Sequence, residues 1–368
     1  MHFIYLMLKV NKMNIFNFSP GPSKIPKSVI EKVEKSISSY KNTNKSILEI
    51  SHRSNEFQEL MKEIEINFSK LFNLNKEINI LLLQGGATFQ NSFIPMNITK
   101  NKTLGCFVTG TWGKKTSEDY SKITNNIEII DSRNQVLTKY LEEEYTGFEN
   151  LDYLHMTSNE TIEGVQVKNF NRINHKNLII DMSSDLGSYN FNFDNLSYVY
   201  AGAQKNMGIP GVTICLVKDE FIVNTDNPKY LNLELLVKSK SILNTPPTMS
   251  IYVLNLITHW MIEMGGVDYF QSKSDNQSKE IYDFIDTNSK ILNCNVDPNF
   301  RSKSNIVFNF LEDHQNKEFV DLAIENGIIG INGHRSVGGI RVSLFNSVDD
   351  DMFEYFMNFF KKYISERK

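Results

Sequence analysis

The segment LIIDMSSDLGSYNFNFDNLSYVYAGAQKNMGIPGVTICLVK, residues 178–218, decides the fold. It contains three short apolar runs, residues 178–181, 198–200 and 211–217, and each run predicts a β-strand. Only a short Gly/Pro turn separates Lys205 from the third run. Because that gap is too short for a helical crossover, we expect the third strand to run antiparallel to its neighbour.

Short apolar runs alternate with helical stretches upstream of this segment as well. The expected strands are residues 78–83, 103–108, 127–130 and 153–156. Helical spacing predicts helices over residues 26–40 and 56–72. Several of the strands are apolar on both faces, as buried parallel strands tend to be. The pattern therefore indicates an α/β fold with a mostly parallel sheet.

Downstream, a strong helical pattern over residues 250–264 ends at Gly265-Gly266, where we place a domain boundary. Beyond it we expect a smaller α+β domain. Its elements are a helix over 267–288, a strand over 306–310, a helix over 317–326, a strand over 339–345 and a helix over 349–364. The predicted divisions are an N-terminal extension (1–12), an arm that packs with the small domain (13–26), a large domain (27–264) and the small domain (265–368).

The composition argues against several classes of protein. The 368 residues are 40% hydrophobic and 22% charged, with a net charge of −4. This weakly acidic balance offers no broad attraction for nucleic acid or an anionic membrane. The apolar run at residues 3–8 is too short to span a bilayer and lacks the flanks of a signal peptide. Cys106, Cys215 and Cys294 are far apart, which favours a reducing cytoplasm over a disulfide framework or a zinc site.

Four features with chemical potential follow strand ends in chain order. They are the turn Gly85-Gly86 with Thr88, Trp112 in a Gly-rich loop, Asp181, and Lys205 between small residues. The turn opens a helix whose N–H groups suit a phosphate, and a tryptophan suits stacking on a flat ring. An aspartate suits a pyridinium nitrogen. A buried lysine becomes a competent amine nucleophile.

Each feature taken alone has a plainer explanation. A Gly-Gly pair is more often a turn, a tryptophan more often packs, an aspartate here resembles a helix cap, and the lysine is equally well explained as a surface residue. Their joint order is nevertheless what a site for pyridoxal 5′-phosphate (PLP) requires. Ligands of an open α/β sheet lie beyond the carboxyl ends of its strands. The sequence therefore predicts a PLP enzyme that carries its cofactor as a Schiff base on Lys205.

Longer motifs resemble those of one family, the phosphoserine aminotransferases, which are fold type I PLP enzymes of the class V aminotransferases. The matching motifs are NFSPGP (17–22), EISHR (49–53), QGGA (84–87), NETIEG (159–164), YAGAQKN (200–206), NTPPT (244–248) and GHRSVGGIR (333–341). They cover nearly all of the chain after Met13. The resemblance implies a large domain on a mostly parallel sheet with one antiparallel strand, and a smaller α+β C-terminal domain.

The resemblance also implies a role for each cofactor residue. Lys205 would bind PLP covalently, Asp181 would hold the ring nitrogen, Trp112 would stack on the ring and Thr161 would contact its phenolic oxygen. The residues that would hold the cofactor phosphate are Ala87, Thr88 and Gln204, with Asn244 and Thr245 from a second subunit. A homodimer with shared active sites follows from the last two.

The implied substrates carry two anionic groups, which call for planar donors such as arginine. Arg341 matches the ligand of the α-carboxylate. The set that matches the phosphate site is His334 and Arg335, with His52 and Arg53 from the partner subunit. An isolated arginine is more often in a surface ion pair, but two His-Arg pairs in Gly- and Ser-flanked loops favour a site. The implied reaction is reversible transamination between phosphoserine and 2-oxoglutarate, in serine biosynthesis.

Some features depart from the family pattern, and two rival functions stay open. Thr88 stands where some members have arginine. Residues 226–243 form a shorter segment than in some relatives, and residues 226–240 do not align clearly. One rival is another fold type I enzyme, such as an alanine- or serine-glyoxylate aminotransferase, or a cysteine desulfurase using Cys294. The other is a non-catalytic protein that kept the fold. The phosphorylated substrate is favoured by the His-Arg pairs, and catalysis by Lys205, Asp181 and Trp112 together.

Overall fold

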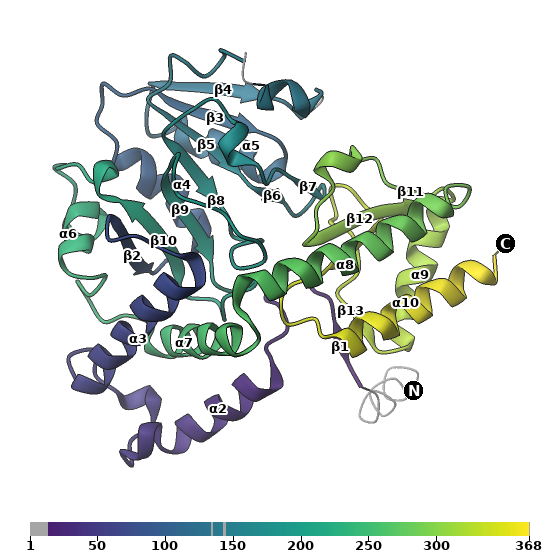
Figure 1. Ribbon diagram of the computed structural model, residues 1–368, viewed down its shortest axis with the longest axis horizontal. Coiled ribbons are helices and arrows are strands. Elements are labelled where there is room, and N and C mark those ends of the chain that lie inside the picture. The colour runs from purple at the N-terminus through teal and green to yellow at the C-terminus, as the bar shows by residue number, and fades with distance from the viewer. Residues whose placement is uncertain (1–13, 134, 143–144, 368) are drawn as a thin grey trace.

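The computed structural model describes residues 14–133, 135–142 and 145–367 (Figure 1). The predicted N-terminal extension, residues 1–12, lies outside the described residues. In the described part of the chain, no helix is long and apolar enough to cross a membrane. A large body built on the main sheet and a smaller C-terminal body are joined by one long helix (Figure 1).

The main sheet has seven strands in the order β2-β10-β9-β8-β5-β3-β4. They are β2 (Ile78–Leu83), β3 (Leu104–Val108), β4 (Ile127–Asp131), β5 (Tyr153–Thr157), β8 (Leu178–Asp181), β9 (Leu196–Gly202) and β10 (Thr213–Lys218). Five of these strands, from β9 to β4 in sheet order, pair in parallel. β10 runs antiparallel to both β2 and β9. The predicted mostly parallel sheet with one antiparallel strand is confirmed.

Helices cover both faces of this sheet. The helices on one face are α2 (Lys27–Ser38), α3 (Asn55–Phe72) and α7 (Thr248–Glu263), and those on the other include α4 (Gly86–Met96) and α5 (Thr111–Tyr120). Alternate side chains of β10 belong to the hydrophobic cores on opposite faces of the sheet. Ile214 and Leu216 belong to the core under α3 and α7, whereas Cys215 and Val217 belong to the core under α4 and α5. Burial on both faces explains why these strands read as continuous apolar runs.

The C-terminal body has its own three-stranded sheet and its own core. The sheet has the order β11 (Leu292–Asn293), β12 (Asn305–Phe310) and β14 (Ile340–Ser343), flanked by α9 (Asp313–Glu325) and α10 (Asp350–Ser365). Helix α9 begins earlier than predicted, because its polar first turn gives no apolar periodicity. Strand β14 is shorter than predicted, because the pairing with β12 ends where Ser343 meets Asn305.

Helix α8 (Gly266–Thr287) joins the two bodies (Figure 1). Its residues Val267 and Phe270 belong to the core of the large body, whereas Ile281 and Ile285 belong to the core of the small one. The helix begins at the predicted boundary, yet it contributes to both cores. A division at residue 265 stays a prediction.

Short elements complete the chain. They are β1 (Phe16–Asn17), β6 (Asn159–Glu160), β7 (Val165–Gln166), α6 (Leu233–Lys238) and β13 (Ile328–Ile329). β1 pairs in parallel with β13, and the following Phe18 is buried in the small body's core. Residues 226–243, the segment that departs from the family pattern, contain α6. Ser241 joins them to the sheet, since its Oγ accepts a hydrogen bond from the Leu82 backbone at 2.9 Å.

Replacing Phe18 by alanine should lower the free energy of unfolding by about 3–5 kcal/mol, because large-to-small changes in a core leave a cavity. Phe18 is 0% exposed and its ring centroid lies 5.3 Å from that of Phe356. Urea unfolding followed by circular dichroism measures the change. Ile15→Ala is the control, since Ile15 is 45% exposed. Equal effects of the two substitutions would contradict packing of the arm on the small body.

Candidate active site

A cavity of about 490 Å³ lies where β3, β5, β8 and β9 reach their carboxyl ends. The predicted site residues that line it are Ala87, Thr88, Trp112, Thr161, Asp181, Gln204, Lys205, His334 and Arg341. The predicted residues outside it are His52, Arg53, Asn244, Thr245 and Arg335. The position agrees with the rule that ligands of open α/β sheets bind beyond the carboxyl ends of the strands.

Lys205 enters this cavity from the turn between the antiparallel strands β9 and β10. Ser23 of the N-terminal arm holds the turn, because its backbone N–H donates to Gln204 O at 3.0 Å and its hydroxyl donates to Lys205 O. Burial lowers the pKa of the Lys205 ammonium, and the charge of Asp181 partly opposes this shift. A lowered pKa enlarges the fraction of neutral amine, which is the nucleophilic form.

Asp181 is the last residue of β8 and lines the same cavity. Its Oδ1 accepts hydrogen bonds from the backbone N–H and the hydroxyl of Ser183, at 2.9 and 2.6 Å. Among the described residues, none donates a hydrogen bond to Oδ2. Burial raises the pKa of Asp181, and the two Ser183 hydrogen bonds act against this rise. One carboxylate oxygen is thus oriented by the protein and the other is available to a ligand.

Trp112 and Thr161 are joined to each other at the cavity wall. The indole Nε1 donates a hydrogen bond to Thr161 Oγ1 at 2.8 Å. An indole nitrogen can only donate, so Thr161 acts as the acceptor in this contact. The proton of the threonine hydroxyl therefore stays available for an acceptor oxygen on a ligand ring.

The N-terminus of α4 forms another wall. Gly85 and Gly86 have φ values of 102° and 70°, in the left-handed region that favours glycine. The cap residue supplies no side-chain hydrogen bond, and the first turn contains no acidic residue. Gly86, Ala87 and Thr88 line the cavity, so backbone N–H groups and the positive end of the helix dipole are placed for an anion.

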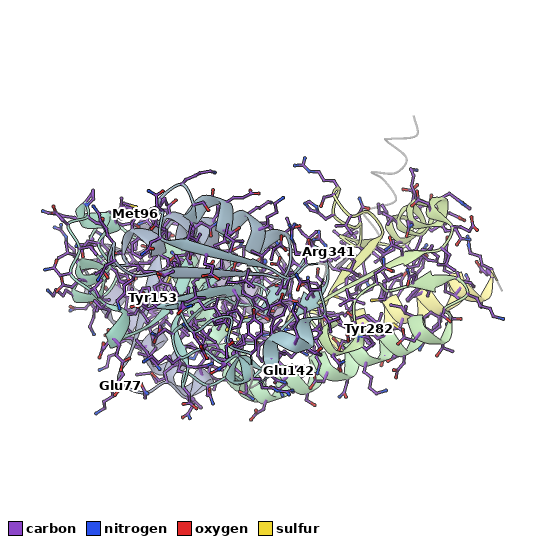
Figure 2. All side chains as sticks on the ribbon, turned by 90° about the horizontal axis from the view of Figure 1, so that it is seen from above. Glu77, Met96, Glu142, Tyr153, Tyr282 and Arg341 are labelled. Carbon is purple, nitrogen blue, oxygen red and sulfur yellow. The ribbon has the colours of Figure 1, made fainter. Side chains whose placement is uncertain are left out.

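Arg341, on β14, is the cationic wall contributed by the C-terminal body, and Figure 2 labels it at the junction of the two bodies. It is only 8% exposed, and its Nη1 donates to Thr161 O at 3.2 Å. Its Nε is buried without a hydrogen-bond partner, and in the described part of the chain no carboxylate lies within ion-pair distance. Burial lowers the pKa of this guanidinium. An unpaired buried charge is costly, which indicates that an anionic ligand completes the site.

The other predicted anion-binding residues surround the cavity less closely. His334 lines it, and its Nδ1 lies 2.6 Å from Ser336 Oγ. Burial, followed by the charges of Arg341 and Arg335, lowers the pKa of His334. Arg335 itself is exposed.

Residues predicted to act from a second subunit lie outside this chain's cavity. Arg53 is exposed and His52 half-buried. Asn244 and Thr245 contact Gln84 instead, whose Nε2 donates to Asn244 Oδ1 at 3.0 Å and to Thr245 O at 3.1 Å. One chain alone therefore brings together only part of the predicted set.

Two residues of the site have no counterpart in the sequence predictions. Thr157 pairs with Asp181 across β5 and β8, lines the cavity and has a buried hydroxyl without a hydrogen-bond partner. Glu160 is fully buried and accepts a hydrogen bond from the backbone N–H of Trp112. The position of Thr157 at the end of a strand could have indicated a site residue. Nothing in the local sequence marks Glu160 as buried.

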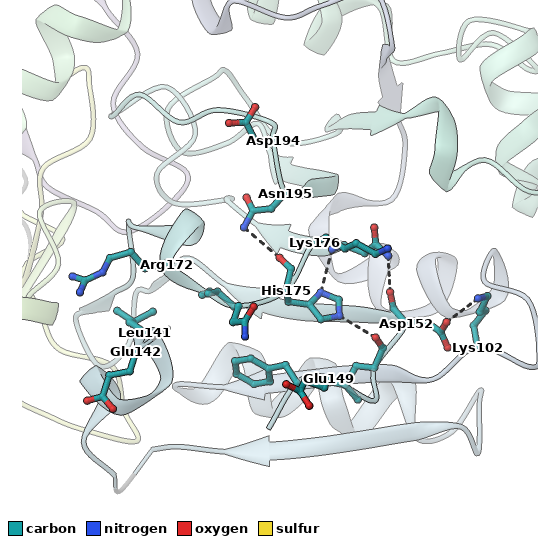
Figure 3. A pocket seen from close by; sticks show the side chains of 15 residues that line it. Lys102, Leu141, Glu142, Glu149, Asp152, Arg172, His175, Lys176, Asp194 and Asn195 are labelled. Atoms are coloured by element: carbon teal, nitrogen blue, oxygen red, sulfur yellow. Dashed lines mark hydrogen bonds and ion pairs between the residues drawn. The ribbon is translucent and has the colours of Figure 1, made fainter. Parts of the chain in front are cut away.

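A larger hollow of about 1240 Å³ lies elsewhere, near residues that directly precede β5 and β8 (Figure 3). Several of its polar groups are paired with neighbouring groups of the chain. His175 Nε2 donates to Leu151 O at 3.0 Å, and Asn177 N donates to His175 Nδ1 at 3.1 Å. Lys102 forms an ion pair with Asp152 at 2.7 Å. These groups stabilise the fold at the amino ends of the strands, opposite the edge where the predicted site residues gather.

Known proteins match this chain over nearly its whole length. The profile of the aminotransferase class-V family matches residues 15–356. A phosphoserine aminotransferase of Bacillus cereus is 38% identical over 358 residues, which cover 96% of this chain and 99% of the relative. The solved phosphoserine aminotransferase of Bacillus circulans subsp. alkalophilus has a TM-score of 0.89 at 33% identity, covering 96% of this chain and 99% of that one.

A second solved structure, described as PLP-bound phosphoserine aminotransferase from Trichomonas vaginalis, has a TM-score of 0.86 at 27% identity and covers 95% of this chain and 100% of that one. The strand order, the cavity at the carboxyl edge and these full-length matches agree with one another. The chain belongs to the phosphoserine aminotransferase family of the class-V aminotransferases, which have the fold of type I PLP enzymes.

Proposed function

We propose that this protein catalyses PLP-dependent transamination between phosphoserine and 2-oxoglutarate, giving 3-phosphohydroxypyruvate and glutamate, reversibly and in serine biosynthesis. The observation that carries the proposal is the unpaired, buried guanidinium of Arg341 in the same cavity as Lys205 and Asp181. An amino-acid substrate supplies the carboxylate that this guanidinium lacks. The relatives named above support the phosphorylated substrate.

The residues present fit PLP as the resident cofactor. The cavity volume is within the range of roughly 300–1,000 Å³ that small-molecule sites occupy. Lys205 offers an amine, Asp181 an open carboxylate oxygen, and the α4 N-terminus a place for a phosphate. Thr161 retains a hydroxyl proton for an oxygen on the ring. The unpartnered hydroxyl of Thr157 is one further polar group for the same ligand.

When bound, PLP supplies an electron sink for the bond to be broken at the substrate's α-carbon. Lys205 would hold the cofactor covalently and, as a free amine, would take and return the proton at that carbon. Asp181 would keep the ring nitrogen protonated, an arrangement that the Ser183 hydrogen bonds orient. Arg341 would fix the α-carboxylate, which orients the α-carbon toward Lys205.

We also propose a cytoplasmic homodimer with shared sites. His52, Arg53, Asn244 and Thr245 lie outside the cavity of their own chain, and a partner that supplies them would complete the binding of both phosphates. Arg335 and His334 would act on the substrate phosphate from the same chain. All three cysteines are free thiols, as expected in a reducing compartment.

The rival functions have less support. A cysteine desulfurase needs a catalytic cysteine at the site, but Cys106 and Cys215 are buried and Cys294 does not line the cavity. An alanine–glyoxylate aminotransferase from Nostoc sp. shares the fold at a TM-score of 0.74, but at only 16% identity. A non-catalytic role gives no reason to keep the Arg341 charge buried and unpaired.

Phosphoserine and glutamate should each convert the cofactor to its aminated form, and serine should do so at least about 100-fold less efficiently, because it lacks the phosphate. Cofactor absorbance after mixing purified enzyme with each amino acid measures this. Equal conversion by serine and phosphoserine would overturn the substrate assignment and leave the PLP assignment standing.

Arg341→Met should raise the KM for glutamate on the order of 100-fold, because a charge-assisted pair with the carboxylate is lost. The melting temperature of the substrate-free protein should stay equal or rise, because a costly unpaired charge is removed. Arg301→Met is the matched control, since Arg301 forms an ion pair with Asp286 at 2.7 Å away from the cavity. That control should lower the melting temperature and leave KM unchanged, and the same pattern in Arg341→Met would contradict the proposed role.

A further inference from the structure

Glu160 and Thr161 both form hydrogen bonds with Trp112, Glu160 at its backbone and Thr161 at its ring. Glu160 Oε2 accepts a hydrogen bond from the backbone N–H of Trp112 at 2.8 Å, and Oε1 accepts one from Gly113 N–H at 2.8 Å. Thr161 Oγ1 accepts the indole hydrogen bond, also at 2.8 Å. The orientation of the Trp112 ring is therefore tied to the strand β6 and the residue that follows it.

Glu160 reaches these groups from full burial, with 0% of its surface exposed. In the described part of the chain, no cationic side chain lies within ion-pair distance of its carboxylate. Its partners are the open N–H groups at the start of α5, where the helix dipole is positive and the cap residue Gly110 offers no side-chain acceptor. Burial raises the pKa of Glu160 to about 8.

A simpler residue would cap this helix at lower cost. Serine or aspartate at the cap position satisfies the same N–H groups from a place close to solvent. The chain instead has glycine there, and a fully buried carboxylate inserted from another element. Capping alone therefore does not account for Glu160.

The surrounding glycines leave the space that the carboxylate occupies. A Cβ on Gly110 would lie 2.5 Å from Glu160 Cγ, which no real contact allows. A Cβ on Gly113 would lie 3.2 Å from Glu160 Oε1 and 3.3 Å from Val108 Cα. Gly110 is thus accounted for by the Glu160 side chain, and Gly113 by Glu160 together with the Val108 backbone.

We infer that Glu160 is a positioning residue of the cofactor site, which sets the plane of the Trp112 ring and the hydroxyl of Thr161 without touching the cofactor. Glu160 does not itself line the cavity, whereas Trp112 and Thr161 do. The inference rests on the proposed roles of these two residues in binding PLP. A small displacement of the α5 N-terminus would both tilt the Trp112 ring and break the hydrogen bond between its indole and Thr161.

Glu160→Gln tests the inference, because the amide keeps the shape but offers a single acceptor to two backbone N–H groups. The PLP dissociation constant, measured by titrating the apoenzyme and following cofactor absorbance, should rise at least ten-fold. The fluorescence of the apoenzyme should itself change, since Trp112 is one of only two tryptophans. The kcat should fall while the KM for phosphoserine changes less than two-fold, because Glu160 makes no hydrogen bond to the proposed substrate ligands.

Two further variants guard against a general loss of structure. Glu149→Gln makes the same substitution at an exposed position and should match the parent in every measurement. Gly113→Ala moves the Glu160 carboxylate without removing it, and should give an intermediate loss of PLP affinity with an unchanged far-ultraviolet circular dichroism spectrum. Parent-like PLP affinity and fluorescence in both Glu160→Gln and Gly113→Ala would overturn the inference.

The Trp112→Ala background separates a positioning role from a packing role. If Glu160 acts through Trp112, Glu160→Gln should weaken PLP binding much less in that background than in the parent. An equal, additive effect would overturn the inference. Parent-like PLP affinity of Trp112→Ala itself would instead reject the proposed cofactor role of Trp112, so the two failures are distinguishable.

Discussion

The antiparallel pairing of β10 with β9 is the constraint on which the site depends. It requires the chain to reverse at the carboxyl edge of the sheet, and Lys205 lies in that connection, residues 203–212. Because β10 also pairs with β2, and Ser23 holds the turn through Gln204 and Lys205, the lysine backbone is supported on both sides. The neighbouring parallel strand β8 ends at Asp181 in the same cavity.

Around this turn the protein keeps charged and polar groups buried without partners. The Nε of Arg341 and the hydroxyl of Thr157 have no hydrogen-bond partner, and Asp181 and Lys205 both have pKa values shifted by burial. Such groups lower the stability of the free protein and strengthen the binding of a ligand that pairs with them. The two bodies line the cavity with different residues: the large body supplies the proposed cofactor residues, and β14 of the small body supplies Arg341.

The sequence predicted the parts of this arrangement that depend on local patterns. Apolar runs located the strands, and polar residues at their ends located Asp181 and Lys205. It did not reveal Glu160, because a carboxylate in a short polar motif carries no local sign of burial. It also missed the first turn of α9, which lacks apolar residues. Arg53 and Asn244 lie outside the cavity of their own chain, so their predicted roles rest on the proposed dimer.

The most direct test of the account is to find which lysine carries the cofactor. Borohydride reduction converts a Schiff base to a stable secondary amine, and mass spectrometry of the digested enzyme then locates the phosphopyridoxyl group. The account predicts this group on the peptide that contains Lys205. Lys115 also lines the cavity, with its Nζ 4.5 Å from the centre of the Trp112 ring. Label on Lys115, or on any lysine other than Lys205, would contradict the account.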